Sequence, residues 1–245
     1  MSSKDLSLTE LFRKRKGLIL RVFHKNNPTK QLEGPNGITS YTAYLAMQAY
    51  QGSISCISDV PVCPSVLYSD IATYDGSVGG FVLNANTTIL ACQTLIIPTG
   101  ISFAITDGRT LTNLGTINIA GFFFNTGTII NAGTFISNGT TNNTVNSVFR
   151  NTGSIQITGT GFFANTDATS TLFNTGRIVN NNFGNFTNGG TIYNYQGGAI
   201  TNNGSFIIIS GQKVYNPTSS GSPCGVGILN GSAPITATGN NCPPS

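Results

Sequence analysis

Apolar and polar positions recur in short, evenly spaced units along the second half of the chain. The unit reads Asn-x-Gly-x-(Ile/Phe), as in NTGTI from Asn125 and NAGTF from Asn131. From Asn174 onward, with QGGAI as a one-letter variant, a longer and a shorter spacing between the units alternate. We take the asparagine that opens each unit as a corner residue of a structural repeat, and these residues are Asn113, Asn125, Asn131, Asn151, Asn174, Asn182, Asn188 and Asn202.

This spacing predicts a β-solenoid. Each unit supplies a short strand with an inward apolar residue and then a corner, where Gly and Asn tolerate left-handed backbone angles. Three units make a coil of about 20 residues, and coils stack at roughly 4.8 Å. Asparagines at equivalent corners can then form hydrogen-bonded ladders. The sequence therefore predicts an all-β fold, a right-handed parallel β-helix of about six coils.

Two other interpretations of the repeat are weaker. Gly and Asn every six residues oppose a helix throughout. A disordered Asn/Gly-rich tract is disfavoured because Ile, Phe and Val recur inside the units, and disordered segments are poor in these residues.

The composition divides the chain into four parts. A capping box formed by Ser7 and Glu10 predicts a basic helix over about 8–24, and a Ser cap with a terminal Gly predicts a second helix over 40–52. The expected parts are a basic helical arm and linker (1–37), a short helix with an irregular Cys- and Pro-containing connector (38–86), the β-helix (87–210) and an irregular tail that covers the last coil (211–245).

Charge is scarce and concentrated in the arm. Charged residues make up 8% of the chain, against about 25% in an average protein. The first thirty residues hold eight basic and two acidic side chains, so they carry about +6 and the remainder about −2. Apolar residues between the charges favour docking onto a protein partner over a solubilising tail, while nucleic acid and anionic membrane remain open. The expected docking residues are Arg13, Lys14, Arg15, Lys16, Leu18, Leu20, Arg21 and Phe23.

Targeting signals and cysteines add little. No signal peptide is evident, and no run of about eighteen apolar residues predicts a membrane span. The only histidine is His24, and the cysteine spacing matches no zinc site, so we expect no metal or other cofactor. Cys224 and Cys242 can staple the tail, and Cys56 and Cys63 can pair locally. The odd total of five cysteines leaves at least one unpaired within the chain, and the actual pairing stays open.

Catalytic candidates are few. Glycoside hydrolysis needs two carboxylates that face one bond, and the predicted β-helix offers only Asp107 and Asp167. There is no GxSxG nucleophile motif and no phosphate-binding loop. We therefore expect a protein that is not an enzyme.

The run LIIPTGISFAITDGRTLTNLGTINIAG (95–121), with the NTGTI and NGGTI units after it, resembles the Asn/Gly-rich parallel β-helix proteins encoded by large DNA viruses of algae and protists. Bacterial adhesin-like repeats are similar over the same span, about 87–210. The opening LTELFRKRKGLILRVF and the tail CGVGILNGSAPITATGNNCPP resemble virion-associated proteins of those viruses. The resemblance implies a minor capsid or particle-surface component.

Together these features predict a structural protein of a viral particle: a minor capsid, cement or surface-projection component docked through its arm onto capsid or other virion proteins. Its expected location is the particle shell or surface, and a homo-oligomer such as a trimer is compatible with the fold. The chief alternative is an adhesin-type module at a cell surface that binds glycans through a Thr/Asn face. A polysaccharide-active enzyme is the third.

Overall fold

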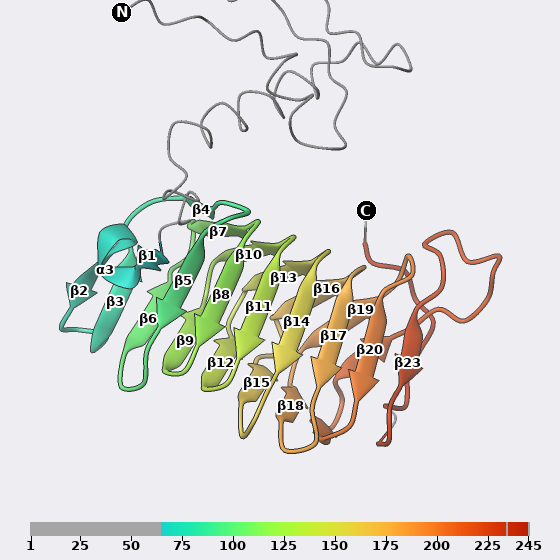
Figure 1. The fold of residues 1–245 in the computed structure, drawn as a ribbon. Helices are drawn as coiled ribbons and strands as arrows, with labels where there is room; N and C mark the ends of the chain where they lie inside the picture. The colour runs from blue at the N-terminus through green and yellow to red at the C-terminus, as the bar shows by residue number, and fades with distance from the viewer. Residues whose placement is uncertain (1–64, 234, 245) are drawn as a thin grey trace, which may run out of the picture. The chain divides into compact units, whose positions relative to one another are not determined.

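A computed structural model describes residues 65–233 and 235–244 of the 245-residue chain. In these residues the chain winds through three sheets to form a β-solenoid of about six coils, with one short helix (Figure 1). The solenoid predicted from the repeat is therefore confirmed. The predicted arm, both predicted helices (8–24 and 40–52) and all the predicted docking residues lie outside the described residues.

Each complete coil contributes one strand to each sheet, and we number the sheets in the order used below. Sheet I contains β4 (Thr87–Ile89), β7 (Thr110–Asn113), β10 (Thr128–Asn131), β13 (Val148–Asn151), β16 (Thr171–Asn174), β19 (Thr191–Asn194) and β22 (Lys213–Tyr215). Sheet II contains β1 (Ser65–Leu67), β5 (Thr94–Ile97), β8 (Thr116–Ile119), β11 (Thr134–Ser137), β14 (Ser154–Ile157), β17 (Arg177–Asn180), β20 (Ala199–Asn202) and β23 (Ile228–Asn230). Sheet III contains β2 (Ala72–Asp75), β3 (Gly80–Leu83), β6 (Ser102–Ile105), β9 (Phe122–Asn125), β12 (Thr140–Asn143), β15 (Phe162–Asn165), β18 (Asn185–Asn188) and β21 (Ser205–Ile208).

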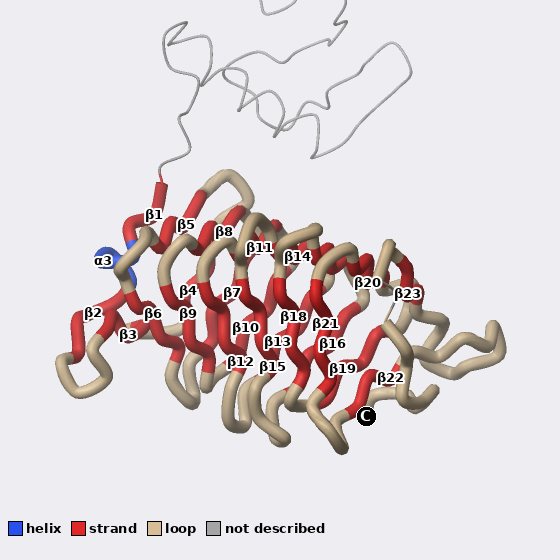
Figure 2. Tube along the Cα trace, turned by 90° about the horizontal axis from the view of Figure 1, so that it is seen from below, coloured by secondary structure: helices blue, strands red, loops and turns tan. Residues whose placement is uncertain are grey.

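The strands pair in parallel from coil to coil, apart from the antiparallel pair β2 and β3. In sheet I, Asn113 pairs with Asn131 and Asn131 with Asn151, at sequence separations of 18 and 20. The next pair, Asn151 and Asn174, has a separation of 23. The predicted coil length is thus confirmed. The variation arises in the corners, which form aligned rows of loops between the strands (Figure 2).

Alternate residues of every strand point into the solenoid, as the period of two in a β-strand requires. The second residue of each four-residue strand is apolar in most coils, and six fully buried phenylalanines lie in contact along the interior. Successive ring centroids lie 5.6 Å apart for Phe103–Phe123 and 5.5 Å apart for Phe123–Phe135. The aromatic column continues through Phe149, Phe163, Phe186 and Phe206. The column runs from the coil of β6 to that of β21, and isoleucine and leucine side chains from the three sheets complete the core.

The repeat glycines are present for a different reason from the one the sequence suggested. The backbone φ is positive at eight glycines, among them Gly100 and Gly108, but at none of the glycines that follow a repeat asparagine. A Cβ on Gly153 would instead overlap the carbonyl oxygen of Gly133 in the preceding coil, and a Cβ on Gly176 would overlap that of Gly153. The predicted left-handed corner is therefore wrong at these positions. Glycine is needed there because successive coils approach too closely for a side chain.

The solenoid extends beyond the predicted range 87–210 at both ends. At the N-terminal end, β1 and β3 continue sheets II and III, and helix α3 (Tyr68–Ile71) connects β1 to β2. At the C-terminal end, β22 and β23 begin a further coil. The tail after β23 then lies across that end: Ile235 joins the core, and the Thr238 N–H donates to the Val214 carbonyl at 2.9 Å. This is the arrangement expected of a cover.

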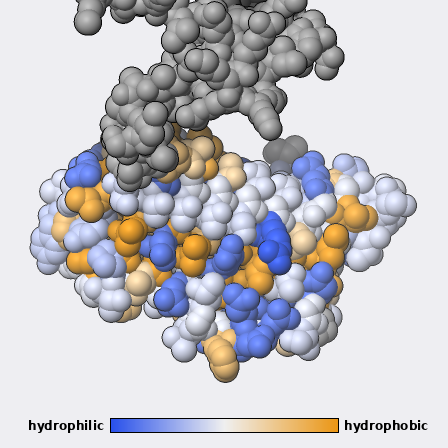
Figure 3. Space-filling view, in the orientation of Figure 1, coloured by the Kyte–Doolittle hydropathy of each residue, from blue (hydrophilic) through white to orange (hydrophobic). Residues whose placement is uncertain are grey.

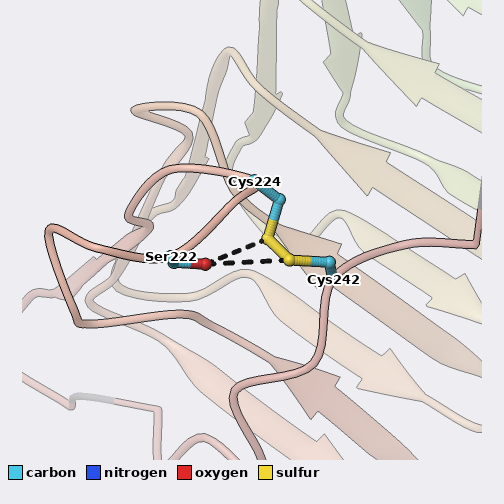
Figure 4. The surroundings of a disulfide bond; sticks show 3 residues. All are labelled: Ser222, Cys224 and Cys242. Carbon is cyan, nitrogen blue, oxygen red and sulfur yellow. Dashed lines mark hydrogen bonds between the residues drawn. A yellow bond between two sulfur atoms is a disulfide. The ribbon is translucent and has the colours of Figure 1, made fainter.

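A disulfide joins Cys224 and Cys242, with Ser222 Oγ 3.3 Å from the Cys224 sulfur (Figure 4). It closes a loop between residues 18 apart in the sequence, and it settles one of the pairings that the sequence left open. Cys92 is disulfide-bonded as well. The Cys224–Cys242 bond ties the segment before β23 to the far end of the tail.

We expect the double variant Cys224→Ser, Cys242→Ser to lower the free energy of opening the tail by about 3 kcal/mol. This is the loop-closure entropy term that a cross-link of this size removes from the unfolded chain. Hydrogen exchange measured peptide by peptide should show faster exchange over 212–244 and unchanged protection over 110–200. A variant is preferred to a reductant, since a reductant would also reduce the bond of Cys92. Equal loss of protection in both ranges would contradict a role confined to the tail.

Candidate functional surfaces

Seven of the eight repeat asparagines lie inside the solenoid, at the last position of a strand. The longest ladder runs along sheet I, where the Nδ2 of each asparagine donates to the Oδ1 of the next at 2.6–2.7 Å. Its members are Asn113, Asn131, Asn151, Asn174, Asn194 and Asn216. A second ladder in sheet III joins Asn125, Asn143, Asn165 and Asn188 at 2.7–2.9 Å, and a short one in sheet II joins Asn180 to Asn202 at 2.7 Å.

Asn182 does not belong to this set. It is exposed in the turn between β17 and β18, and the equivalent inward position is taken by Asn180, two residues earlier. Asn182 therefore lies in a corner but is not equivalent to the other seven repeat asparagines, which end strands inside the solenoid. Asn182 does open an Asn-x-Gly motif, but the corner here is longer, so the motif begins inside the corner and not at the end of the strand.

Five ladder residues do not belong to an Asn-x-Gly unit and so were not predicted from the sequence: Asn143, Asn165, Asn180, Asn194 and Asn216. Each is followed by a longer corner, so no glycine stands two residues later. The signal that identifies them lies before the asparagine in the sequence, not after it. An inward residue precedes each asparagine by two positions, as Phe163 does Asn165 and Ile192 does Asn194, because both side chains share the inner face.

The ladders begin where the preceding coil offers an apolar side chain. Asn113 is paired with Ile89 of the preceding coil, and Asn180 is paired with Ile157 of the preceding coil. The Oδ1 atoms of Asn113 and Asn180 accordingly have no donor among the described residues. A carbonyl oxygen buried without a partner is costly. These two atoms are the unsatisfied ends of otherwise continuous hydrogen-bonded rows.

The two candidate catalytic carboxylates lie on the same row of corners but do not meet. Asp107 is in the corner between β6 and β7, and Asp167 in the corner between β15 and β16, three coils further on. Three coil spacings amount to about 14 Å, whereas paired glycosidase carboxyl groups lie about 5–9.5 Å apart. Neither residue lines either of the two hollows found at the C-terminal end.

Asp167 is instead engaged in its own turn. Its Oδ1 accepts the Thr169 hydroxyl at 2.6 Å and the Thr169 backbone N–H at 2.9 Å. These hydrogen bonds, the side-chain one first, hold the pKa of Asp167 below its ordinary value of 3.8. A general acid needs a raised pKa, so the direction of this shift fits a turn-forming residue.

The lowered pKa makes a pH prediction. Because the folded pKa lies below the unfolded one, the stabilising contribution of Asp167 is present above the unfolded pKa and is lost as the pH falls through the folded pKa. An NMR titration should place the carboxyl midpoint of Asp167 below 3.8, and Thr169→Val should move it back up. As a control, Ser77→Ala should shift Asp75, which is held the same way, and leave Asp167 alone. An unchanged Asp167 midpoint in Thr169→Val would contradict the assignment.

The outer face of sheet I carries a row of cationic and aromatic side chains. The guanidinium of Arg150 lies 4.5 Å from the ring centroid of Phe173, and Phe173 stacks on Tyr193 at 5.4 Å. Tyr193 stacks in turn on Tyr215 at 5.1 Å. Burial and, second, the neighbouring Tyr215 raise the pKa of Tyr193. Since the rings cover one another's faces, the row offers edges and hydroxyls to a ligand.

The repeat pattern in the sequence does not reveal this row. Arg150, Phe173, Tyr193 and Tyr215 are the third residues of β13, β16, β19 and β22, and they become neighbours only through the cross-coil register. Their sequence separations equal those of the ladder asparagines next to them, which are 23, 20 and 22. Because these separations differ, a search of the sequence at one fixed spacing would not find the four residues as neighbours.

Two further observations concern metal binding and membrane insertion of the described residues. Within the described residues, no three His, Cys, Asp or Glu side chains gather closely enough to hold a metal ion. The same part of the chain contains no helix with the length and apolar character that crossing a bilayer requires. Comparison with family models, curated proteins and solved structures finds no match to this chain.

Proposed function

We propose that the protein is a non-enzymatic structural component of a viral particle, serving as a minor capsid, cement or surface-projection protein. The observation that carries the proposal is the interior of the solenoid. Unbroken asparagine ladders and an aromatic column link each coil to the next. Such a rod resists bending without a thick core, which suits a spacer or projection. We take its winding to be right-handed, the hand that parallel β crossovers adopt.

The distribution of charge supports packing among other proteins. The described residues carry four acidic and four basic side chains: Asp70, Asp75, Asp107, Asp167, Arg109, Arg150, Arg177 and Lys213. On the face that sheet II presents, hydrophilic and near-neutral residues are mixed with apolar ones (Figure 3). Without a strong net field, copies of the rod can lie close to neighbouring subunits.

In this proposal the basic segment 13–23 attaches the rod to capsid or other virion proteins. Its eight expected contact residues are those named from the sequence, and contact with nucleic acid or anionic membrane is the competing role. The location follows as the particle shell or surface. A homo-oligomer, including a trimer, is compatible with this role.

The test is incorporation into particles. Replacing Arg13, Lys14, Arg15 and Lys16 together by Gln should lower the copy number per particle at least tenfold, measured against the major shell protein. A matched variant, Arg109→Gln with Arg177→Gln, removes positive charge from the solenoid instead and should be incorporated normally. Normal incorporation of the first variant would contradict docking through the arm.

The second candidate is an adhesin-type module that binds glycans at a cell surface, and the outer row of sheet I favours it. Tyrosine hydroxyls beside a row of threonines (Thr171 and Thr191) can hydrogen-bond sugar hydroxyls. On a glycan array, the protein without residues 1–37 should then bind, and Tyr193→Ala should lose binding. If no glycan is retained, this candidate fails. A polysaccharide-active enzyme, the third, would require activity that Asp107→Asn or Asp167→Asn removes.

A further inference from the structure

The three sheets do not end together at the C-terminal end of the solenoid. Sheets I and II continue into the last, partial coil with β22 and β23, whereas sheet III stops one coil earlier at β21. The chain leaves β23 for the tail, and within the described residues no strand occupies the next position of sheet III. In the described part of the chain, the last coil therefore has two strands instead of three. We call the position beside β21 the strand slot; the tail residues Ala233, Ile235 and Thr236 flank it, and no described strand fills it.

The backbone of β21 faces this slot with unused hydrogen-bonding groups. The N–H of Ser205 donates to the Gly184 carbonyl at 3.0 Å, and the N–H of Ile209 donates to that of Asn188 at 2.8 Å, both in the preceding coil. Because successive residues of a strand point their polar groups to opposite sides, the N–H and C=O of Phe206 and Ile208 point into the slot. No described residue forms a hydrogen bond with them.

The side chains at the slot are apolar and incompletely covered. Phe206 and Ile208 are inward residues, yet both remain half-buried. Phe186, which pairs with Phe206 one coil earlier, is fully buried. An open hollow of about 400 Å³ lies between these two residues and the tail residues Ala233, Ile235 and Thr236. The strand belongs to an uncharged run, GSFIIISG (204–211), with Ile207 54% exposed. Edge strands often carry a charge that prevents pairing, and this one carries none.

We propose that the strand slot binds one extended segment of a partner protein, which adds to sheet III as the missing strand and places apolar side chains at alternate positions over Phe206 and Ile208. Backbone hydrogen bonds at the edge of β21 supply affinity. The hollow supplies specificity, because it favours a segment with apolar side chains at every second position. A second copy of β21 fits less well. A four-residue edge covers far less than the roughly 800 Å² per partner of a stable dimer, while a single strand fills both the edge and the hollow. The inference is independent of the particle assignment.

A soluble probe exists within the chain itself. The peptide GISFAITDGR, residues 100–109, contains β6, whose Phe103 and Ile105 are the inward residues of sheet III one coil after β3. Fluorescently labelled and titrated with the full-length protein, it should bind saturably. Absence of binding would overturn the proposal.

Two N-methylated versions of the peptide test strand addition itself. In parallel pairing, as between all neighbouring strands of sheet III from β3 to β21, the amides of Ser102 and Ala104 face β21, and those of Phe103 and Ile105 face away. Methylation of the first pair should weaken binding at least tenfold, and methylation of the second pair should leave it within about twofold. The reverse result supports addition in the antiparallel direction. If both or neither of the peptides lose affinity, backbone pairing is excluded and the proposal fails.

A protein variant gives an independent test. Ile208→Pro removes a slot-facing N–H, which an edge strand tolerates, and should lower peptide affinity at least tenfold, while Ile208→Val should bind within about threefold of wild type. If the wild-type protein sediments as a dimer that Ile208→Pro converts to a monomer, a second copy occupies the slot and the partner-segment proposal is wrong. If Ile208→Pro does not fold, the two methylated peptides still test whether the segment pairs with the backbone of β21.

Discussion

Asn151→Ala is expected to destabilise the solenoid by about 3 kcal/mol. Asn151 is 1% exposed at the centre of the sheet I ladder, where it accepts from Asn131 and donates to Asn174 Oδ1 and to the Arg177 carbonyl. Alanine leaves the buried Asn174 Oδ1 without its donor and opens a void, and an unsatisfied buried polar group alone costs about 1–3 kcal/mol. Urea unfolding followed by circular dichroism measures the change.

The control for this prediction has the same sequence motif. Asn182→Ala changes an asparagine that also opens an Asn-x-Gly unit but lies exposed on a turn. Its effect should stay within about 0.5 kcal/mol, as is usual for surface substitutions. If Asn151→Ala and Asn182→Ala have equal effects, the ladder does not stabilise the coils.

Gly153→Ala is expected to be at least as damaging, at about 3 kcal/mol or more, or to prevent folding. The added Cβ would overlap the carbonyl oxygen of Gly133 and press on the backbone around Ala132. No flexible side chain is available to move aside, so the coils themselves must separate. Overpacking of this kind typically costs about 1–3 kcal/mol and sometimes more. Thermal unfolding and the yield of soluble protein report the effect.

Gly76→Ala is the matched control, because a Cβ there would meet nothing closer than the Tyr74 ring at 4.0 Å. We expect Gly76→Ala to be neutral within about 0.5 kcal/mol. A stable Gly153→Ala protein would show that the coils are further apart than the structure has them.

The sequence predicted the solenoid because its two requirements are local. An apolar residue inside each strand and a small residue after the strand end recur at short intervals, so Ile129 and Gly133 are visible without knowledge of the fold. The same pattern misled at Asn182, because the motif does not reveal the length of the corner. It also suggested the wrong reason for glycine, since Gly153 meets the backbone of Gly133, which lies a whole coil earlier in the chain.

Other features depend on cross-coil register, which no short window of sequence contains. The row from Arg150 to Tyr215 forms only after coils of unequal length align. The strand slot likewise requires knowing that sheet III ends at β21 while its neighbours continue. The segment before residue 87 lacks the repeat, so β1 and β3 were not expected to extend the sheets.

The most direct test of the structural role is quantitative peptide mass spectrometry of purified viral particles, with and without protease treatment. Our proposal predicts abundant solenoid peptides from 87–230 in particles, and cleavage sites in the basic segment 13–23 that are protected in intact particles and cut after disruption. Absence of the protein from particles would contradict the proposed function.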